Sequence, residues 1–198
     1  VYLDTSGEPL FKRGYRRDTD EAPLRENLAA GLLALTGWTP AQPLLDPMCG
    51  SGTIVIEVAL IAADRAPGLS RTFGFQKLAW FDGPSWQRMK QSARDRMTLA
   101  PATPTIFGRD LAAGAVGKTQ ANLRAAGVDG FVHVEQGDFL ERPAPAPAGI
   151  LLTNPPYGVR LADLEALGRQ YPLWGDVLKQ RYAGWNAYFF TGDLRLPK

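Results

Sequence analysis

The residues best suited to chemistry form the run Asn154-Pro155-Pro156-Tyr157, which directly follows the apolar residues 149–153. An amide side chain, a backbone carbonyl beside a fixed ring and a flat aromatic surface together suit the binding of a planar ring that carries an amine. Both prolines fix φ and lack an N–H, so the turn cannot be absorbed into a sheet, and Pro155 biases Asn154 towards an extended backbone. Simple rigid turns are also often rich in proline, so this run alone leaves both interpretations open.

A glycine-rich turn at residues 46–53 is the second candidate. It follows a short apolar strand and precedes the apolar run 54–63, which is typical of a buried helix. Gly50 and Gly52 permit positive φ and close approach of a ligand to the backbone. The N–H groups at the start of the helix favour a carboxylate or phosphate. The glycine spacing matches neither the P-loop nor the dinucleotide-binding fingerprint, which argues against an ATPase or a dehydrogenase.

Together, the two motifs resemble the S-adenosylmethionine-dependent methyltransferases that modify exocyclic amines of nucleobases. The form Asp46-Pro-Met-Cys-Gly-Ser-Gly-Thr53, with Thr153-Asn-Pro-Pro-Tyr-Gly158 downstream, is most similar to the bacterial 23S ribosomal RNA guanine-N2 methyltransferases, an NPPY-type family associated with THUMP domains. The resemblance covers nearly the whole chain. It extends to residues 14–16, 22–30, 110, 122, 126–127 and 185–188.

This resemblance implies a class I methyltransferase fold, S-adenosyl-L-methionine as cofactor, and methyl transfer to the N2 amine of a guanine in 23S ribosomal RNA. It also implies an upstream THUMP RNA-binding domain, in some relatives a second methyltransferase domain downstream, and a cytoplasmic location. Two alternatives stay open. One is an adenine-N6 or glutamine N-methyltransferase, since an Asn-Pro-Pro-Tyr turn serves any planar amine, and the other is a non-catalytic RNA-binding module.

The resemblance also assigns roles to individual residues, with catalysis at Asn154, Pro155, Pro156 and Tyr157. The residues expected to bind the cofactor are Asp46, Met48, Cys49, Gly50, Ser51, Gly52, Thr53, Asp110, Leu111, Asp138, Phe139 and Asn154. Asp110 would hold the ribose and Asp138 the adenine amino group. The alternatives are a plain helix cap for Asp110 and a simple turn for Asp138.

Basic residues are the expected RNA contacts. Net charge is only +2, from 22 Lys and Arg against 20 Asp and Glu, which permits nucleic-acid binding without demanding it. The candidate phosphate contacts are Lys12, Arg13, Arg16 and Arg160, although a basic run such as residues 12–17 also suits an ordinary solvated surface. Arg25 and Glu26 either border the cofactor pocket, as in similar proteins, or form a surface pair.

Cysteine and histidine usage excludes several other chemistries. Cys49 is the single cysteine, so an internal disulfide and a cysteine-based zinc site are excluded. The single histidine, His133, falls in a strand-like run and is expected to be packed or on the surface, which disfavours a Ser-His-Asp hydrolase. We expect Cys49 to be a small apolar filler beside a ligand, and we expect no metal.

Hydrophobic patterning predicts one α/β domain over residues 1–198, with a lead-in strand or hairpin and helix in residues 1–40 and a Rossmann-like core in 41–198. Strands are expected near 44–46, 105–108, 132–134, 149–153 and 185–190, and helices near 23–36, 53–66, 85–99, 111–126 and 161–182, the last interrupted around Gly168 and Pro172. Such alternation predicts a doubly wound, mostly parallel sheet with ligands at the strand carboxyl ends.

Three further expectations concern the remaining segments. The aromatic residues 68–84 are expected to pack over the sheet edge. The C-terminal strands of the class are expected to be truncated, because its final helix and hairpin have no counterpart after residue 190. No stretch reaches the ~20 apolar residues of a membrane span, and no signal segment is evident at the start.

Overall fold

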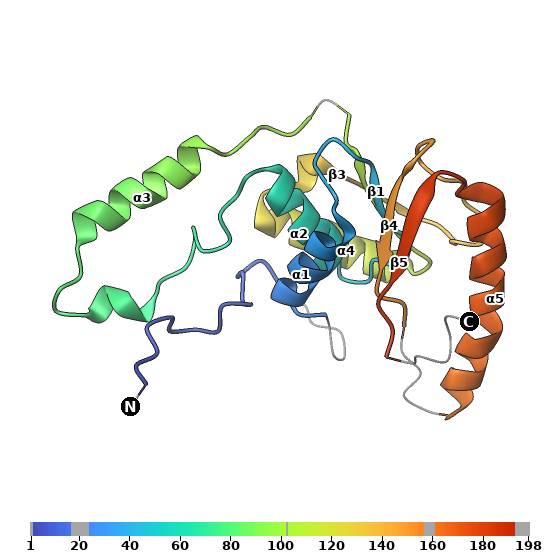
Figure 1. The fold of residues 1–198 in the computed structure, drawn as a ribbon, viewed down its shortest axis with the longest axis horizontal. Helices are drawn as coiled ribbons and strands as arrows, with labels where there is room; N and C mark the ends of the chain where they lie inside the picture. Colours follow the sequence, from blue (N-terminus) through green and yellow to red (C-terminus); the bar gives the residue numbers. More distant parts are fainter. Residues whose placement is uncertain (1, 17–23, 102, 157–160, 193–198) are drawn as a thin grey trace.

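The computed structural model describes residues 2–16, 24–101, 103–156 and 161–192 (Figure 1). In chain order the elements are α1 (Glu26–Thr36), β1 (Leu44–Asp46), α2 (Thr53–Ala62), the 3-10 helix η1 (Gly74–Lys77), α3 (Gly83–Asp95), β2 (Ile106–Asp110), α4 (Ala113–Ala126), the 3-10 helix η2 (Asp129–Phe131), β3 (Val132–Gln136), β4 (Gly149–Thr153), α5 (Leu161–Arg181) and β5 (Trp185–Phe189). Within the described ranges, no helix has the length and apolarity needed to cross a membrane.

The five strands form one parallel sheet in the order β3-β2-β1-β4-β5. In the central strand, Leu45 lies level with Phe107 of β2 and with Leu151 of β4. The chain builds β1, β2 and β3 towards one edge and then crosses back to place β4 on the other side of β1. A topological switch point therefore lies between β1 and β4, and the predicted doubly wound α/β fold is confirmed.

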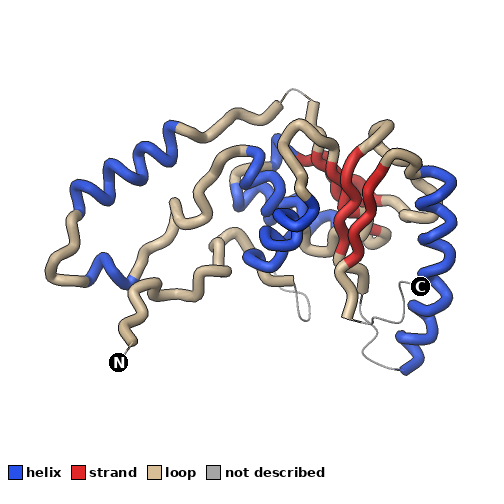
Figure 2. The backbone as a smooth tube through the Cα atoms, in the orientation of Figure 1, coloured by secondary structure: helices blue, strands red, loops and turns tan. Residues whose placement is uncertain are grey.

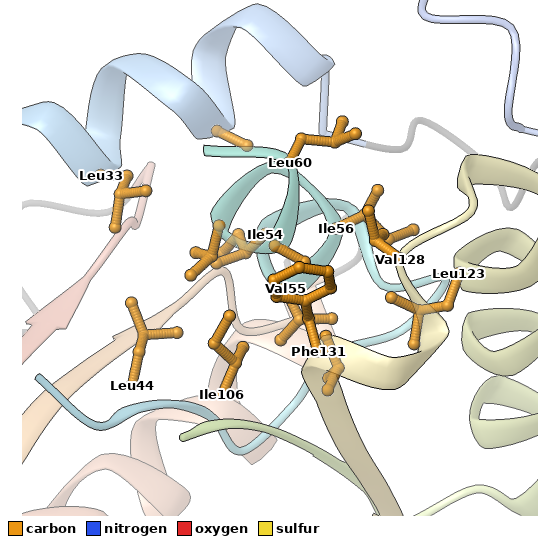
Figure 3. Packing of buried hydrophobic residues seen from close by; sticks show 14 of the residues in the cluster. Leu33, Leu44, Ile54, Val55, Ile56, Leu60, Ile106, Leu123, Val128 and Phe131 are labelled. Atoms are coloured by element: carbon orange, nitrogen blue, oxygen red, sulfur yellow. The ribbon is translucent and has the colours of Figure 1, made fainter. Parts of the chain in front are cut away.

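Both faces of the sheet are covered at its centre, which explains why β1 and β4 are buried apolar runs rather than alternating sequences. Leu44 and Ile150 face a core shared with α1, α2 and α4, where Ile56 and Leu123 are fully buried (Figure 3). Leu45 and its β4 neighbour Leu151 face the opposite core, which α5 covers. Glycines in the left-handed region end two of the helices, Gly37 after α1 and Gly127 after α4, as their positions predict.

Two expectations about secondary structure are wrong. The helix α5 runs without a break through Gly168 and Pro172. Its buried Trp174 and Val177 pack on the sheet core, and this tertiary contact outweighs the low helix propensity of Gly and Pro. The described lead-in residues 2–16 contain no strand, because their backbone is fixed by loop contacts such as the hydrogen bond from Phe75 N to Thr5 O, 2.8 Å.

Residues 71–98, here called the arm, hold η1 and α3 and extend away from the sheet (Figures 1 and 2). The expectation that the aromatic residues pack over the sheet edge is therefore wrong. Their rings pack on one another instead: Trp86 lies 5.6 Å from Phe73 and 5.1 Å from Phe75, both edge-on. The aromatic rings of the arm therefore pack in a local cluster rather than against the sheet.

Candidate active site

Three strand ends meet at one edge of the sheet, as the strand–helix alternation predicts. The hydroxyl of Thr153, at the end of β4, donates a 2.7 Å hydrogen bond to Asp46 Oδ1 at the end of β1. On the other side of β1, the carboxylate of Asp110, at the end of β2, accepts a 2.9 Å hydrogen bond from Gly50 N. The glycine turn, Asp110 and the Asn154 turn therefore share one rim at the switch point.

The glycine turn is held from behind by α4. Gly50 and Gly52 have φ of 55° and 87°, which only glycine adopts readily. The Thr119 hydroxyl donates to Gly50 O at 2.8 Å, and Asn122 Nδ2 donates to Ser51 O at 3.0 Å. A Cβ on Gly50 would meet no atom within 4 Å, whereas one on Gly52 would lie 2.7 Å from Thr119. Gly50 thus borders open space, while Gly52 permits close packing.

Asp46 is a buried carboxyl group at the start of this turn, 2% exposed. Its Oδ1 also accepts a hydrogen bond from Met48 N at 3.2 Å. Burial raises the pKa of Asp46 to about 7, although the hydrogen bonds from Thr153 and Met48 oppose this shift. The side chain is therefore internal and organises the turn through hydrogen bonds.

Cys49 is buried in the same turn, with its sulfur 3.6 Å from the Thr119 hydroxyl. Burial raises the pKa of the thiol, so it stays protonated and is a poor nucleophile. The side chain fills space between the turn and β2, in agreement with the expected apolar filler. His133 is 57% exposed on β3, which is a surface position.

Asp110 and Leu111 follow β2 at the site. Both Asp110 oxygens accept backbone hydrogen bonds, Oδ2 from Gly50 and Oδ1 from Ala112 N at 2.9 Å. Asp110 lies three residues before the first residue of α4 and is not its N-cap, a position that Ala112 occupies without a side-chain cap. Leu111 is 68% exposed beside it.

Asp138 and Phe139 lie beyond β3. The Asp138 carboxylate accepts from Leu140 N at 2.8 Å. A hydrogen bond between residues two positions apart is typical of a turn, which was the alternative to adenine binding for Asp138. Only the Oδ1 atom of the carboxylate takes part in this bond. The ring of Phe139 is 4% exposed in the α5-side core and lies 5.4 Å from the ring of Tyr182. The ring of Phe139 is therefore part of the core, and its role beside the cofactor stays a prediction.

Asn154, Pro155 and Pro156 continue from β4 without secondary structure, as expected for a proline turn. Pro155 is buried, Asn154 half-buried and Pro156 exposed. Tyr157 and Arg160 lie outside the described residues. Phe190 N, just after β5, donates a 2.9 Å hydrogen bond to Thr153 O, so the end of β5 lies next to the start of the Asn154 turn.

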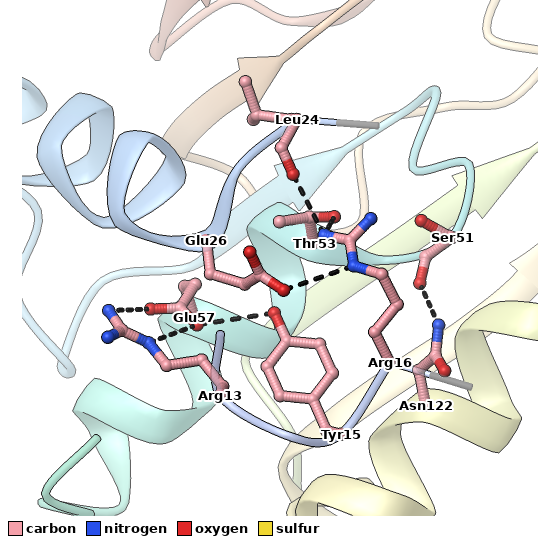
Figure 4. A network of polar contacts seen from close by, with 9 residues as sticks. All are labelled: Arg13, Tyr15, Arg16, Leu24, Glu26, Ser51, Thr53, Glu57 and Asn122. Carbon is pink, nitrogen blue, oxygen red and sulfur yellow. Dashed lines mark hydrogen bonds and ion pairs between the residues drawn. The ribbon is translucent and has the colours of Figure 1, made fainter. Parts of the chain in front are cut away.

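Two arginines of the basic lead-in segment, Arg13 and Arg16, are turned inward, towards α1 and α2 (Figure 4). Arg13 pairs with Glu57 of α2 through Nη2 at 3.2 Å, with side-chain exposures of 13% and 4%. The Tyr15 hydroxyl donates to the same carboxylate at 3.4 Å. Burial raises the pKa of Glu57, while Arg13 opposes the shift. Sequence analysis missed this pair, although a lone glutamate inside an apolar helix is a signal that a partner is required.

Arg16 joins α1 to the start of α2. Its Nε donates to Glu26 Oε1 at 3.2 Å, and Nη2 donates to Thr53 Oγ1 at 3.1 Å. Glu26 is 6% exposed, so it is not a member of a surface pair, and Arg25 stacks instead over the Phe11 ring at 5.1 Å. Among the described residues, the buried Nη1 of Arg16 finds no hydrogen-bond partner.

The three predicted RNA contacts that lie in the described residues therefore have partners within the protein. Arg13 and Arg16 are engaged by buried carboxylates, and Lys12 forms an exposed pair with Glu8 at 2.6 Å. Their role in binding phosphates stays a prediction. Sequence reasoning missed Thr119 and Thr153, whose hydroxyls shape the site; a threonine at the end of an apolar strand gives no signal of its partner. No group of three or more His, Cys, Asp or Glu residues that could hold a metal occurs in the described part of the chain.

Comparison with known proteins identifies the family. Residues 13–198 match the family described as "RMKL-like, methyltransferase domain". The chain is 41% identical over 200 residues to a Synechocystis sp. protein named "Putative RNA methyltransferase slr0064", a match that covers 99% of this chain and 51% of that protein.

Two crystal structures are similar over 98% of this chain and 50% of their own. One is SMU.472 in complex with SAH, with 34% identity and a TM-score of 0.89. The other is a Listeria monocytogenes protein described as a "predicted N6-adenine-specific DNA methylase", with 36% identity and a TM-score of 0.88. The chain spans about half the length of each of these relatives. It belongs to the family of RMKL-like methyltransferase domains.

Proposed function

We propose that this domain transfers a methyl group from S-adenosylmethionine to the exocyclic N2 amine of a guanine in large-subunit (23S) ribosomal RNA. The hydrogen bond between Thr153 and Asp46, 2.7 Å, carries the proposal, because it fixes the Asn154 turn directly beside the glycine turn. The RNA methyltransferase name of the Synechocystis relative supports RNA as the substrate. With ribosomal RNA as substrate, we expect the protein in the cytoplasm.

The site suits S-adenosylmethionine, and the SAH bound to the similar protein SMU.472 supports that cofactor. Gly50 borders open space at the N-terminus of α2, where a carboxylate is favoured. The unpartnered Nη1 of Arg16 lies beside Thr53 and adds a cationic donor there (Figure 4). We propose that residues 48–53 bind the methionine carboxylate, that Asp110 and Leu111 border the ribose, and that Asp138 and the Phe139 backbone border the adenine.

S-adenosylmethionine supplies an electrophilic methyl group on a sulfonium. The chain would then have to orient the amine, whose lone pair is delocalised into the base. Asn154 Oδ1 and the Pro155 carbonyl would each accept an amine hydrogen, which draws the nitrogen towards tetrahedral geometry. The amine would lose its proton after transfer, so no strong base is needed and rate enhancement comes from positioning and electrostatics.

Base access follows from the same arrangement. The target base must leave its helix or loop to enter such a site. Tyr157 would stack on it, which contributes about 1–3 kcal/mol. Pro156 would keep the turn rigid between Asn154 and Tyr157.

An adenine-N6 activity is the second candidate, since the Listeria relative is described as an N6-adenine DNA methylase. The deciding experiment incubates the full-length protein with labelled S-adenosylmethionine and either unmodified ribosomal RNA or DNA, and mass spectrometry then locates the label. Label on guanine N2 in RNA supports the proposal, and label confined to adenine overturns it. Label on a glutamine side chain of a protein would support the glutamine N-methyltransferase alternative.

An Asn154→Ala variant tests the site itself. We expect methyl transfer to fall at least a hundredfold while SAH affinity, measured by calorimetry, stays within a few-fold of the original. Absence of SAH binding by the unmodified protein at millimolar concentration would remove the enzyme interpretation and favour a non-catalytic RNA-binding module. We further propose that residues 1–198 act as one domain and that a THUMP domain upstream, or a second methyltransferase domain downstream, assists on RNA.

A further inference from the structure

The arm, residues 71–98, is far more basic than the rest of the chain. It carries six Lys or Arg residues and two Asp, a net charge of +4, whereas the whole chain has +2. The remainder of the protein is therefore net negative. Arg71 is used internally, where it donates to the backbone carbonyl of Pro9 and lies over the Phe73 ring at 4.8 Å. The side chains of Lys77, Arg88, Arg94 and Arg96 belong to exposed residues.

The two carboxylates of the arm do not neutralise this charge. Asp82 caps α3 and accepts from Ser85 N at 3.0 Å. Asp95 accepts from Gln91 Nε2 at 2.7 Å. Arg96 pairs with Asp64 at 3.3 Å, but both side chains are more than half exposed, and such pairs contribute little. Cations therefore dominate the electrostatic potential of the arm.

Trp80 is the second observation that points to a ligand. It is 77% exposed, whereas the neighbouring rings of Phe73, Phe75 and Trp86 pack together. The arm thus packs most of its aromatic rings against one another and leaves one large ring in solvent, three residues after the exposed Lys77. Exposed aromatic rings interleaved with cations are typical of single-stranded nucleic-acid binding, where bases stack and phosphates pair with Lys and Arg.

We propose that the arm is a binding surface for single-stranded RNA, with Trp80 stacking on a base and Arg88 and Arg94 contacting phosphates. The inference rests on the proposed RNA substrate and adds where that RNA lies. The arm is anchored at its end: Thr98 N donates to Ala63 O at 3.0 Å, and Thr98 Oγ1 donates to Ala62 O at 3.0 Å. RNA on the arm is therefore held in a fixed relation to α2, whose other end forms the glycine turn.

Two charge-reversal variants of this chain test the proposal. Arg88→Glu with Arg94→Glu changes the arm, and the control Arg169→Glu with Lys179→Glu makes the same charge change on exposed positions of α5. Affinity for a fluorescein-labelled single-stranded 20-nucleotide RNA is measured by fluorescence anisotropy over a salt series. The arm variant is expected to bind at least tenfold more weakly, with the slope of log K against log salt reduced by about 1.4, equivalent to two phosphate contacts. The control is expected to stay within twofold.

Trp80→Leu tests stacking without any change of charge. RNA affinity is expected to fall about fivefold or more, with the salt slope unchanged. Equal RNA affinity of the arm variants and the control overturns the proposal, as does the absence of RNA binding by the unmodified chain or tighter binding of the matching single-stranded DNA. Unchanged RNA binding together with loss of an acidic protein partner would reassign the surface to protein binding. Calorimetry with SAH separates the two proposals, since intact SAH binding with no effect of the arm variants leaves the methyltransferase assignment standing.

Discussion

The Thr153 hydroxyl lies 2.7 Å from Asp46 Oδ1, inside the protein and between two parallel strands. Thr153 is fully buried, so Thr153→Val keeps the shape but removes a donor to a buried carboxyl group. We expect a loss of about 1–3 kcal/mol in the free energy of unfolding, measured with urea. The loss should be larger at pH 8 than at pH 5, because the charged carboxylate depends more on the hydrogen bond. An exposed control, Thr72→Val, should change stability by less than about 0.5 kcal/mol, and a loss independent of pH would contradict this account.

Asp46 also predicts how stability varies with pH. Its pKa is about 7 in the folded protein against 3.8 as the ordinary value, so protonation favours the folded state. The free energy of unfolding should therefore fall as pH rises from about 4 to about 7 and then level off, by at most roughly 4 kcal/mol. Asp46→Asn should flatten this dependence, because an amide oxygen still accepts from Thr153 and Met48. Urea unfolding of both proteins at several pH values checks this, and an unaltered pH profile in the variant would refute it.

The two glycines of the turn should respond differently to alanine. Gly52→Ala combines a φ of 87° with a contact of 2.7 Å to Thr119, and we expect a loss of about 2–4 kcal/mol. Gly50→Ala adds a methyl group to open space at a φ of 55°, so we expect the free energy of unfolding to fall by about 1–2 kcal/mol. Gly50→Ala should nevertheless weaken SAH binding at least tenfold by calorimetry. Equal stability losses, or full SAH affinity in Gly50→Ala, would contradict the assigned roles.

The buried pair of Arg13 and Glu57 should be costly to break from one side. Arg13→Met leaves the Glu57 carboxylate, 4% exposed, without its cation. Loss of one partner of a buried ion pair typically lowers the free energy of unfolding by about 3–5 kcal/mol. Burial raises the pKa of Glu57, and loss of Arg13 raises it further, so the destabilisation should be smaller at pH 5 than at pH 8. Adding Glu57→Gln should recover part of the loss in urea unfolding. No recovery would show that Arg13 acts through packing instead.

Local sequence patterns predicted the elements whose cause is local. The strand at Leu44–Asp46 follows from a short apolar run before a glycine turn, and the ends of α1 and α4 follow from Gly37 and Gly127. The course of residues 2–16 and the direction of the arm depend on contacts between distant segments, such as Thr5 with Phe75, and no local pattern encodes them. Pro172 predicted a break in the last helix, but α5 continues through it because the helix packs against the sheet.

The site divides in the same way. The glycine turn and the Asn154 turn are runs of consecutive residues, so the sequence alone could propose both, and their roles in binding and catalysis stay predictions. The partners that hold the glycine turn, Thr119 and Asn122, come from α4, about 70 positions later. Their side-chain hydrogen bonds reach backbone carbonyls that any residue could offer. The inward orientation of Arg16 was hidden for the same reason, because Glu26 and Thr53 lie in separate helices.

The strand order has a consequence for how the chain folds. Asp46 meets Thr153 only across 107 residues, with β2 and β3 between them in sequence. During synthesis from the N-terminus, β1 emerges long before β4 and can first pair with β2 alone. Closure of so long a loop makes this pairing a late step with a high contact order, and folding should be correspondingly slow. Until that step, one edge of the central strand stays open to pairing with other chains, so dilute conditions should favour refolding.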